Sequence, residues 1–150
     1  MAIWFEGEGE IEADVATVAS SYDDLGGHFV GVVSRMPGMS SVELIEQGAD
    51  FVKIRTNEGV MHRSNITRSV SGDRVVVEFD EEYKAGERVA STSHFAHTFS
   101  AAGDGVHHHL VVSDLAFPGV LGFFYRHFGR ASMGKAFLGS NKAYFESLQA

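Results

Sequence analysis

The chain lacks cysteine and has little proline and little positive charge. Its 150 residues include no cysteine, two prolines, and 12 lysines and arginines against 20 acidic residues, for a net charge of −8. Without cysteine, neither a disulfide framework nor a zinc–thiolate site can form. The excess of acid disfavours nucleic acid as a partner, because proteins neutralise phosphates with clustered lysine and arginine.

Long hydrophobic runs are also missing. Residues 1–14 have neither the basic nor the apolar stretch of a secretion signal, and no later run approaches the ~20 apolar residues that span a bilayer. We therefore expect no membrane span and a cytoplasmic location. No internal repeat, low-complexity linker or change in composition divides the chain, so we expect one domain over residues 1–150.

Strict alternation of apolar and polar residues marks the first element. From Ile3 to Ile11 one face carries isoleucine, phenylalanine and glycine, and the other carries Trp4 and three glutamates, which predicts a strand with one solvated face. Asp14 is a candidate N-cap for a short helix that follows this strand. We expect Gly26-Gly27 to end that helix and a second short apolar stretch to follow it.

The middle of the chain reads as successive short strands. Between Val42 and Ala116, β-prone runs are separated by turn signals rich in glycine, asparagine and aspartate, which predicts an antiparallel meander of about six strands. After Pro118, apolar residues recur every three or four positions through Leu148, as on one face of a helix of about 30 residues. Several glycines in this stretch predict a kink or break near Gly129.

This order of elements resembles a known superfamily. Met36-Pro37-Gly38 precedes the second strand, Gly103-Asp104-Gly105-Val106 precedes the last strand, and Leu138 to Glu146 lie in the final helix. These features resemble the START/Bet v 1-like (SRPBCC) superfamily, in particular its bacterial members related to polyketide cyclases and dehydrases. The resemblance implies an α+β helix-grip fold, in which a curved antiparallel sheet wraps around a long C-terminal helix, with two short helices after the first strand. It also implies an elongated cavity between sheet and helix that takes hydrophobic ligands such as lipids.

Eight histidines are the most unusual feature of the composition. The run His107-His108-His109 suggests a metal site, but neighbouring side chains of a strand point to opposite faces, so at most His107 and His109 share a side. We therefore expect neither a metal nor another cofactor.

Strand parity predicts which polar residues face the interior. In the strand that contains His97, the buried set also includes Ser91, Ser93, Phe95 and Phe99, because aromatic residues occupy this face. If the following hairpin pairs Phe99 with His108, the inward set of the last strand includes His108, Leu110 and Asp114. A shift of one residue would instead turn His107 and His109 inward.

In the fourth strand we expect His62 and Ser64 inside, with Arg63 and Asn65 outside. Inward polar groups in such number are typical of a ligand cavity, because a buried polar group without a partner costs on the order of 1 to 3 kcal/mol. We expect Met36 and Met39 to frame its entrance, since flexible side chains suit an adaptable opening. The expected lining is His62, Ser64, Phe79, Ser91, Ser93, Phe95, His97, Phe99, His108, Leu110, Phe124, His127, Ala131, Met133 and Gly134.

Three functions are consistent with this sequence. The first is binding of a small hydrophobic molecule, such as a lipid, an isoprenoid or an aromatic, polyketide-like metabolite. In the second, a cyclase or dehydratase uses His97 or His108 as a general acid and base, and Asp114 fixes the histidine tautomer. The third is a protein-interaction module or a homodimer, in which Trp4, Phe51 and Val76 form an apolar patch on the outer face of the sheet.

Overall fold

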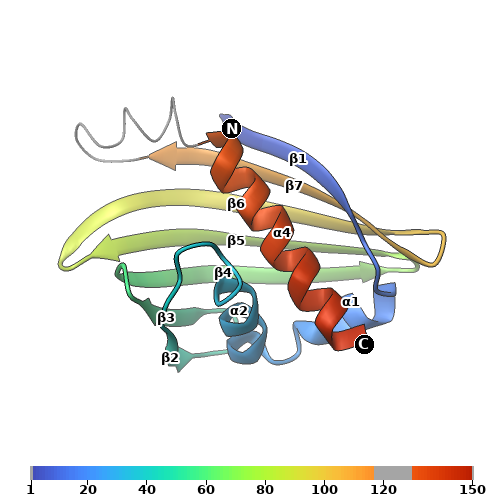
Figure 1. The fold of residues 1–150 in the computed structure, drawn as a ribbon, viewed down its shortest axis with the longest axis horizontal. Coiled ribbons are helices and arrows are strands. Elements are labelled where there is room, and N and C mark those ends of the chain that lie inside the picture. Colours follow the sequence, from blue (N-terminus) through green and yellow to red (C-terminus); the bar gives the residue numbers. More distant parts are fainter. Residues whose placement is uncertain (1, 117–129, 150) are drawn as a thin grey trace.

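The protein consists of a curved antiparallel sheet, two short helices and a long C-terminal helix (Figure 1). The structure is a computed structural model, and it describes residues 2–116 and 130–149. Within these ranges the elements are β1 (Ile3–Ile11), α1 (Val15–Ser21), α2 (Leu25–Val33), β2 (Val42–Gln47), β3 (Val52–Thr56), β4 (Val60–Ser71), β5 (Arg74–Ala85), β6 (Arg88–Ala102), β7 (Gly105–Ala116) and α4 (Arg130–Gln149).

The described strands form one sheet of seven in the order β1-β7-β6-β5-β4-β3-β2. Strands β2 to β7 follow one another as a meander, and β1 completes the sheet by pairing with β7. Helix α4 runs diagonally across one face of this sheet, and α1 and α2 lie on the same side (Figure 1). The predicted helix-grip architecture, with its two short helices after the first strand, is confirmed.

Two local predictions about the helices differ in outcome. Asp14 caps α1 as expected, because its side chain accepts a hydrogen bond of 2.7 Å from the backbone N–H of Thr17. In contrast, Gly26 and Gly27 do not end the first helix but lie inside α2, which Asp24 caps. A Cβ on Gly26 would approach the Leu44 side chain to 2.7 Å, so glycine allows α2 to pack closely on β2. The predicted helix after Pro118 is seen from Arg130 onward, and the expected break near Gly129 lies outside the described residues.

Aromatic residues join α4 to the sheet. Phe137 packs edge-on against Phe95 of β6 with 5.0 Å between ring centroids, and Phe145 packs in the same way against Phe99 at 5.3 Å. We refer to Phe95–Phe137 and Phe99–Phe145 as the two aromatic pairs. All four side chains are at most 8% exposed, so these contacts lie in the hydrophobic core.

The first strand meets α4 through glycine. The ring of Phe5 occupies the place that a Cβ of Gly134 would take, at 2.0 Å, and it also covers Gly7. A bulge between Ile3 and Phe5 alters the alternation of β1 and leaves Trp4 only 8% exposed. The expectation that Trp4 lies on the outer face of the sheet is therefore wrong, while Phe51 and Val76 are half-buried.

Two glycines of α4 provide a test of this contact. We expect Gly134→Ala to lower the free energy of unfolding by roughly 1–3 kcal/mol, because the new methyl group overlaps the ring of Phe5. The control Gly139→Ala places its methyl group in open space on the same helix and should stabilise the protein by about 0.5–1 kcal/mol. Urea denaturation measures both changes, and equal stabilisation by the two substitutions would contradict the packing of Phe5 on Gly134.

Candidate functional site

A hydrogen-bonded histidine pair lies on the inner face of the sheet. β6 and β7 pair in the register that places Phe99 opposite His108, one of the two that the sequence left open, so His97 and His108 both point inward. Nδ1 of His97 lies 2.8 Å from Nε2 of His108, and the residues are 3% and 1% exposed. His107 and His109 point to the opposite face, where they contact glutamates of β1, so the alternative register that would turn them inward does not occur.

The histidine pair is part of an aromatic wall. The ring of His97 stacks beside Phe79, Phe95 and Phe99, with centroids 5.7 to 6.2 Å apart, and Phe99 stacks on His108 at 4.5 Å. Burial, followed by the nearby charges of His109 and His107, lowers the pKa of His108 to about 3. Burial, followed by the proximity of His108 and of the Arg63 guanidinium, also holds the pKa of His97 well below its ordinary value. Both rings are therefore uncharged at neutral pH.

An ion pair is buried next to this wall. Nε and Nη2 of Arg63 lie 2.9 and 2.8 Å from one carboxylate oxygen of Glu81, and the residues are 4% and 9% exposed. The guanidinium carbon lies 4.8 to 5.3 Å from the ring centroids of Phe29, Phe79 and Phe95, a cation–π arrangement. A full positive charge is thus held among aromatic rings and neutralised by one carboxylate.

The sequence analysis predicted the opposite orientation for the side chains in this part of β4. A bulge between Ser64 and Thr67 changes the phase of the strand, so Met61 and Arg63 point inward before it and Ile66 is buried after it. His62 and Ser64 therefore lie on the outer face, contrary to expectation.

The acidic residue of the buried pair carried a signal that could have identified its partner. Glu81 continues the inward series of Val75, Val77 and Phe79 on β5, and a carboxylate in a core position requires a partner such as a cation. The observed partner, Arg63, is the residue directly opposite it on β4.

Asp114 is not part of the interior. It has a positive φ of 55°, and its carboxylate accepts a hydrogen bond of 3.0 Å from the backbone N–H of Ala2. The pairing of β6 with β7 is irregular between Thr92 and His94, which interrupts the inward alternation before Asp114. The side chain is exposed, so the expectation that Asp114 orients His97 or His108 is wrong.

The remaining predicted lining residues divide into groups. Phe79, Phe95, Phe99, Leu110 and Ser93 are buried on the inner face, and Ser91 is half-buried near its end. On α4, Gly134 is buried against Phe5 and Met133 is half-buried, whereas Ala131 is exposed in the first turn and does not face the interior. Phe124 and His127 lie outside the described residues. Met36 and Met39 pack half-buried against the core, and their role as an entrance stays a prediction.

The outer face has a different polar character. A hollow of about 530 Å³ is lined mainly by residues of this face on β4 to β7, including His62, Ser64, Asp80, His94 and Asp114, and its lining also includes Glu81 and Ser93. Nδ1 of His94 lies 2.8 Å from Asp80. No group of three or more histidines and carboxylates in residues 2–116 and 130–149 is arranged to hold a metal ion.

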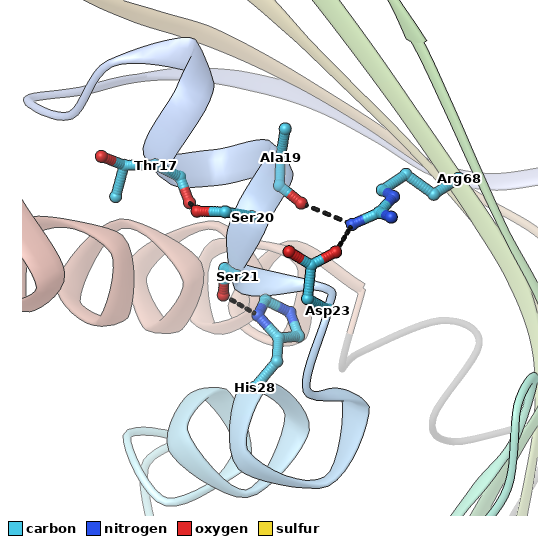
Figure 2. Close-up of polar contacts among 7 residues, drawn as sticks. All are labelled: Thr17, Ala19, Ser20, Ser21, Asp23, His28 and Arg68. Carbon is cyan, nitrogen blue, oxygen red and sulfur yellow. Dashed lines mark hydrogen bonds and ion pairs between the residues drawn. The ribbon is translucent and has the colours of Figure 1, made fainter.

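Helices α1 and α2 are tied to each other and to the sheet (Figure 2). Ser21 Oγ lies 2.7 Å from Nδ1 of His28, and Arg68 of β4 donates to the carbonyl of Ala19 and pairs with Asp23. His28 is 1% exposed, and burial, with the charge of Arg63 second, lowers its pKa to about 3. Sequence reasoning did not assign His28 to the interior, and the alternating pattern that located the others does not apply in a helix.

We expect the stability of the fold to be greatest near pH 6.5. Contacts with carboxylates raise the pKa of His94 and His107 above 6.5, so their stabilising contribution is lost as the pH rises through those raised values. The lowered pKa values of His28, His97 and His108 act on the acid side, where the unfolded chain binds protons that the folded chain does not. Each buried histidine then removes about 1.4 kcal/mol per pH unit below 6.5. Urea denaturation from pH 5 to 8 measures the profile.

Two variants separate the limbs of this profile. His28→Phe should reduce only the loss of unfolding free energy below pH 6.5. His107→Gln should reduce only the loss above pH 6.5. An acid limb unchanged by His28→Phe would show that this ring is already protonated in the folded protein.

The buried ion pair makes a separate prediction. Glu81→Gln should lower the free energy of unfolding by about 3–5 kcal/mol, because it leaves Arg63 buried without its counter-charge. Glu82→Gln is the matched control, since Glu82 is half-buried on the outer face with only a 3.6 Å contact to Lys84, and it should cost less than about 1 kcal/mol. Thermal and urea unfolding give both values, and similar small losses would refute burial of the Arg63 charge.

Within the described ranges, no helix has the length and apolar character needed to cross a membrane.

Comparison with known proteins places the fold. No protein-family model matches the chain, and no curated protein matches it in sequence. Among solved structures, it is similar to protein Ms6760 from Mycobacterium smegmatis, with a TM-score of 0.63, 13% identity and coverage of 96% of this chain and 88% of that one. The Bet v 1 allergen Ara h 8.0201 gives a TM-score of 0.60 at 14% identity, covering 95% and 97%. A STAR-related lipid transfer protein from Xanthomonas axonopodis gives 0.56 at 16% identity, covering 97% and 85%. The chain therefore has the helix-grip fold of the START/Bet v 1-like superfamily.

Proposed function

We propose that the protein binds a small, mostly apolar molecule that carries one polar group, on the inner face of the sheet beneath α4. The observation that supports this most directly is a wall of phenylalanine rings that contains a neutral histidine pair and a neutralised ion pair. Aromatic surface with a few placed polar groups is the usual composition of a small-molecule site. A lipid transfer protein among the structures of the same fold is consistent with the proposal.

A buried histidine pair and a buried ion pair contribute little to stability if their role is only to stabilise the fold. Burying a charge pair is often no more stabilising than well-packed hydrophobic residues of the same volume. Histidines that lose their charge on burial also make the fold less stable in acid. Their presence in the wall is explained if they recognise a ligand.

A single inner-face position tests the proposal. Ser93 is 8% exposed on β6, opposite Glu81, and Ser93→Phe should place a ring beside the ion pair, where it would compete with a ligand. Thr92→Phe is the matched control, because Thr92 is the adjacent residue, is only half-buried and lies opposite Glu82 rather than Glu81. We expect Nile red to bind the wild type and Thr92→Phe alike, and to bind Ser93→Phe at least roughly tenfold more weakly, a loss of about 1.4 kcal/mol.

Native mass spectrometry of the purified protein provides a second measurement. A co-purifying molecule of a few hundred daltons should be present in the wild type and reduced in Ser93→Phe. Equal dye binding by all three proteins would place binding elsewhere, and no binding by the wild type would contradict the proposal.

A cyclase or dehydratase is the second candidate, and the hydrogen bond between His97 and His108 favours it. A proton can pass along such a pair as the two rings exchange tautomers, which suits general acid–base chemistry. The low pKa values of both rings make them weak bases at neutral pH, and Asp114 lies elsewhere. We expect that His97→Gln leaves no activity on polyketone analogues if this function holds. Turnover that persists in His97→Gln would remove His97 from any mechanism.

A homodimer or protein-interaction surface stays a prediction. The large apolar residues that are exposed in the described part of the chain, Ile3, Ile45, Val70 and Leu148, belong to β1, β2, β4 and α4 respectively. This distribution gives less support to an apolar docking patch than the inner face gives to a ligand.

A further inference from the structure

The two aromatic pairs frame a polar position on α4. Asn141 is one helical turn from each of the phenylalanines that α4 contributes to these pairs, which are about 12 Å apart along the helix. The two partners on β6, Phe95 and Phe99, are about 14 Å apart along the strand. Because the two spacings match, Asn141 lies over the middle of this stretch of β6, where His97 is located. Asn141 is 5% exposed.

Hydrogen-bonding capacity is left over at this position. Asn141 donates from Nδ2 to the carbonyl of Phe137 at 2.8 Å, which leaves its Oδ1 as an acceptor. The contact between His97 and His108 uses Nδ1 of the first ring and Nε2 of the second. No residue of the described ranges is hydrogen-bonded to Asn141 Oδ1, to His97 Nε2 or to His108 Nδ1. A ligand with a matching group could use this remaining capacity, since a hydrogen bond typically contributes on the order of 0.5–1.5 kcal/mol.

The chemistry of the histidine pair specifies what would match. Two neutral rings carry two ring protons, and one of them lies in the shared hydrogen bond. The two outer nitrogens therefore present one donor and one acceptor, and exchange of tautomers switches which ring carries which. Either ring can satisfy a hydroxyl group or a carbonyl group.

The charges around this position cancel. Among the described residues, Arg63 is the only buried side chain that carries a positive charge, since the buried histidines are neutral. Glu81 neutralises this charge. A carboxylate or an ammonium group at His97 would bring an uncompensated charge into an aromatic interior, which is far more costly than burying a hydrogen-bonded neutral group.

We propose that the polar group of the ligand is uncharged, a hydroxyl or a carbonyl, and that it is bound between His97 of β6 and Asn141 of α4. This inference rests on the proposed function, which requires only that an apolar molecule binds on the inner face. It adds a ligand class, neutral alcohols and ketones, and excludes fatty acids and amines.

Four probes of one shape test the inference. Isothermal titration calorimetry at pH 7 would compare naphthalene, 2-naphthol, 2-acetonaphthone and 2-naphthoate with the wild-type protein. We expect 2-naphthol and 2-acetonaphthone to bind at least roughly tenfold more tightly than 2-naphthoate. His97→Phe, which continues the row of rings on β6, should reduce the affinity for 2-naphthol to that for naphthalene. Asn141→Leu replaces the amide by an apolar side chain of similar volume and should have the same effect. This variant provides the test if His97→Phe does not fold.

Each outcome separates the two proposals. If none of the four probes binds, the proposed function is wrong. If naphthalene binds and 2-naphthoate binds as well as 2-naphthol, the proposed function stands and the inference of an uncharged polar group is overturned. If 2-naphthol keeps its advantage over naphthalene in both His97→Phe and Asn141→Leu, its hydroxyl is bound elsewhere and the assigned position is overturned.

Discussion

Neutralisation of one buried guanidinium constrains much of this structure. Arg63 lies among three phenylalanine rings, and Glu81 on the neighbouring strand is its counter-charge. The two residues lie directly opposite each other in the register of β4 against β5. The same register turns His62 and Ser64 to the outer face. The positive charge contributes to the low pKa values of His28 and His97, so it helps to keep the interior free of further cations.

The two faces of the sheet use histidine in opposite ways. His97 and His108 on the inner face contact each other and aromatic rings, and burial keeps them neutral. His94 and His107 on the outer face contact carboxylates that favour their charged form. The pKa values of His107 and His108, adjacent residues of β7, are therefore shifted in opposite directions although the two are neighbours in sequence. The environment of each side chain, rather than the residue type, decides its chemistry.

Sequence patterns were sufficient for the fold and for half of the candidate site. Regular alternation in β6 predicted that His97 faces inward, but the sequence left open the register of β7, which decides that His108 meets it. The errors occur where a bulge or an irregular pairing adds a residue to one strand, as at Trp4, His62 and Asp114. A bulge changes the phase of every later residue but has no clear sequence signature, since it depends on pairing with a distant strand.

The position of β1 has a consequence for the order in which the chain can fold. β1 pairs with β7, so the first strand contacts the last strand of the sheet, about a hundred residues later in the chain. During synthesis, β2 to β6 can form hairpins with their neighbours soon after each strand emerges, whereas β1 has no strand partner until β7 is complete. In that interval β1 is an open edge that other chains could pair with. Its three glutamates, spaced every second residue, provide like charges that oppose such pairing, and the histidines of β7 later supply their partners.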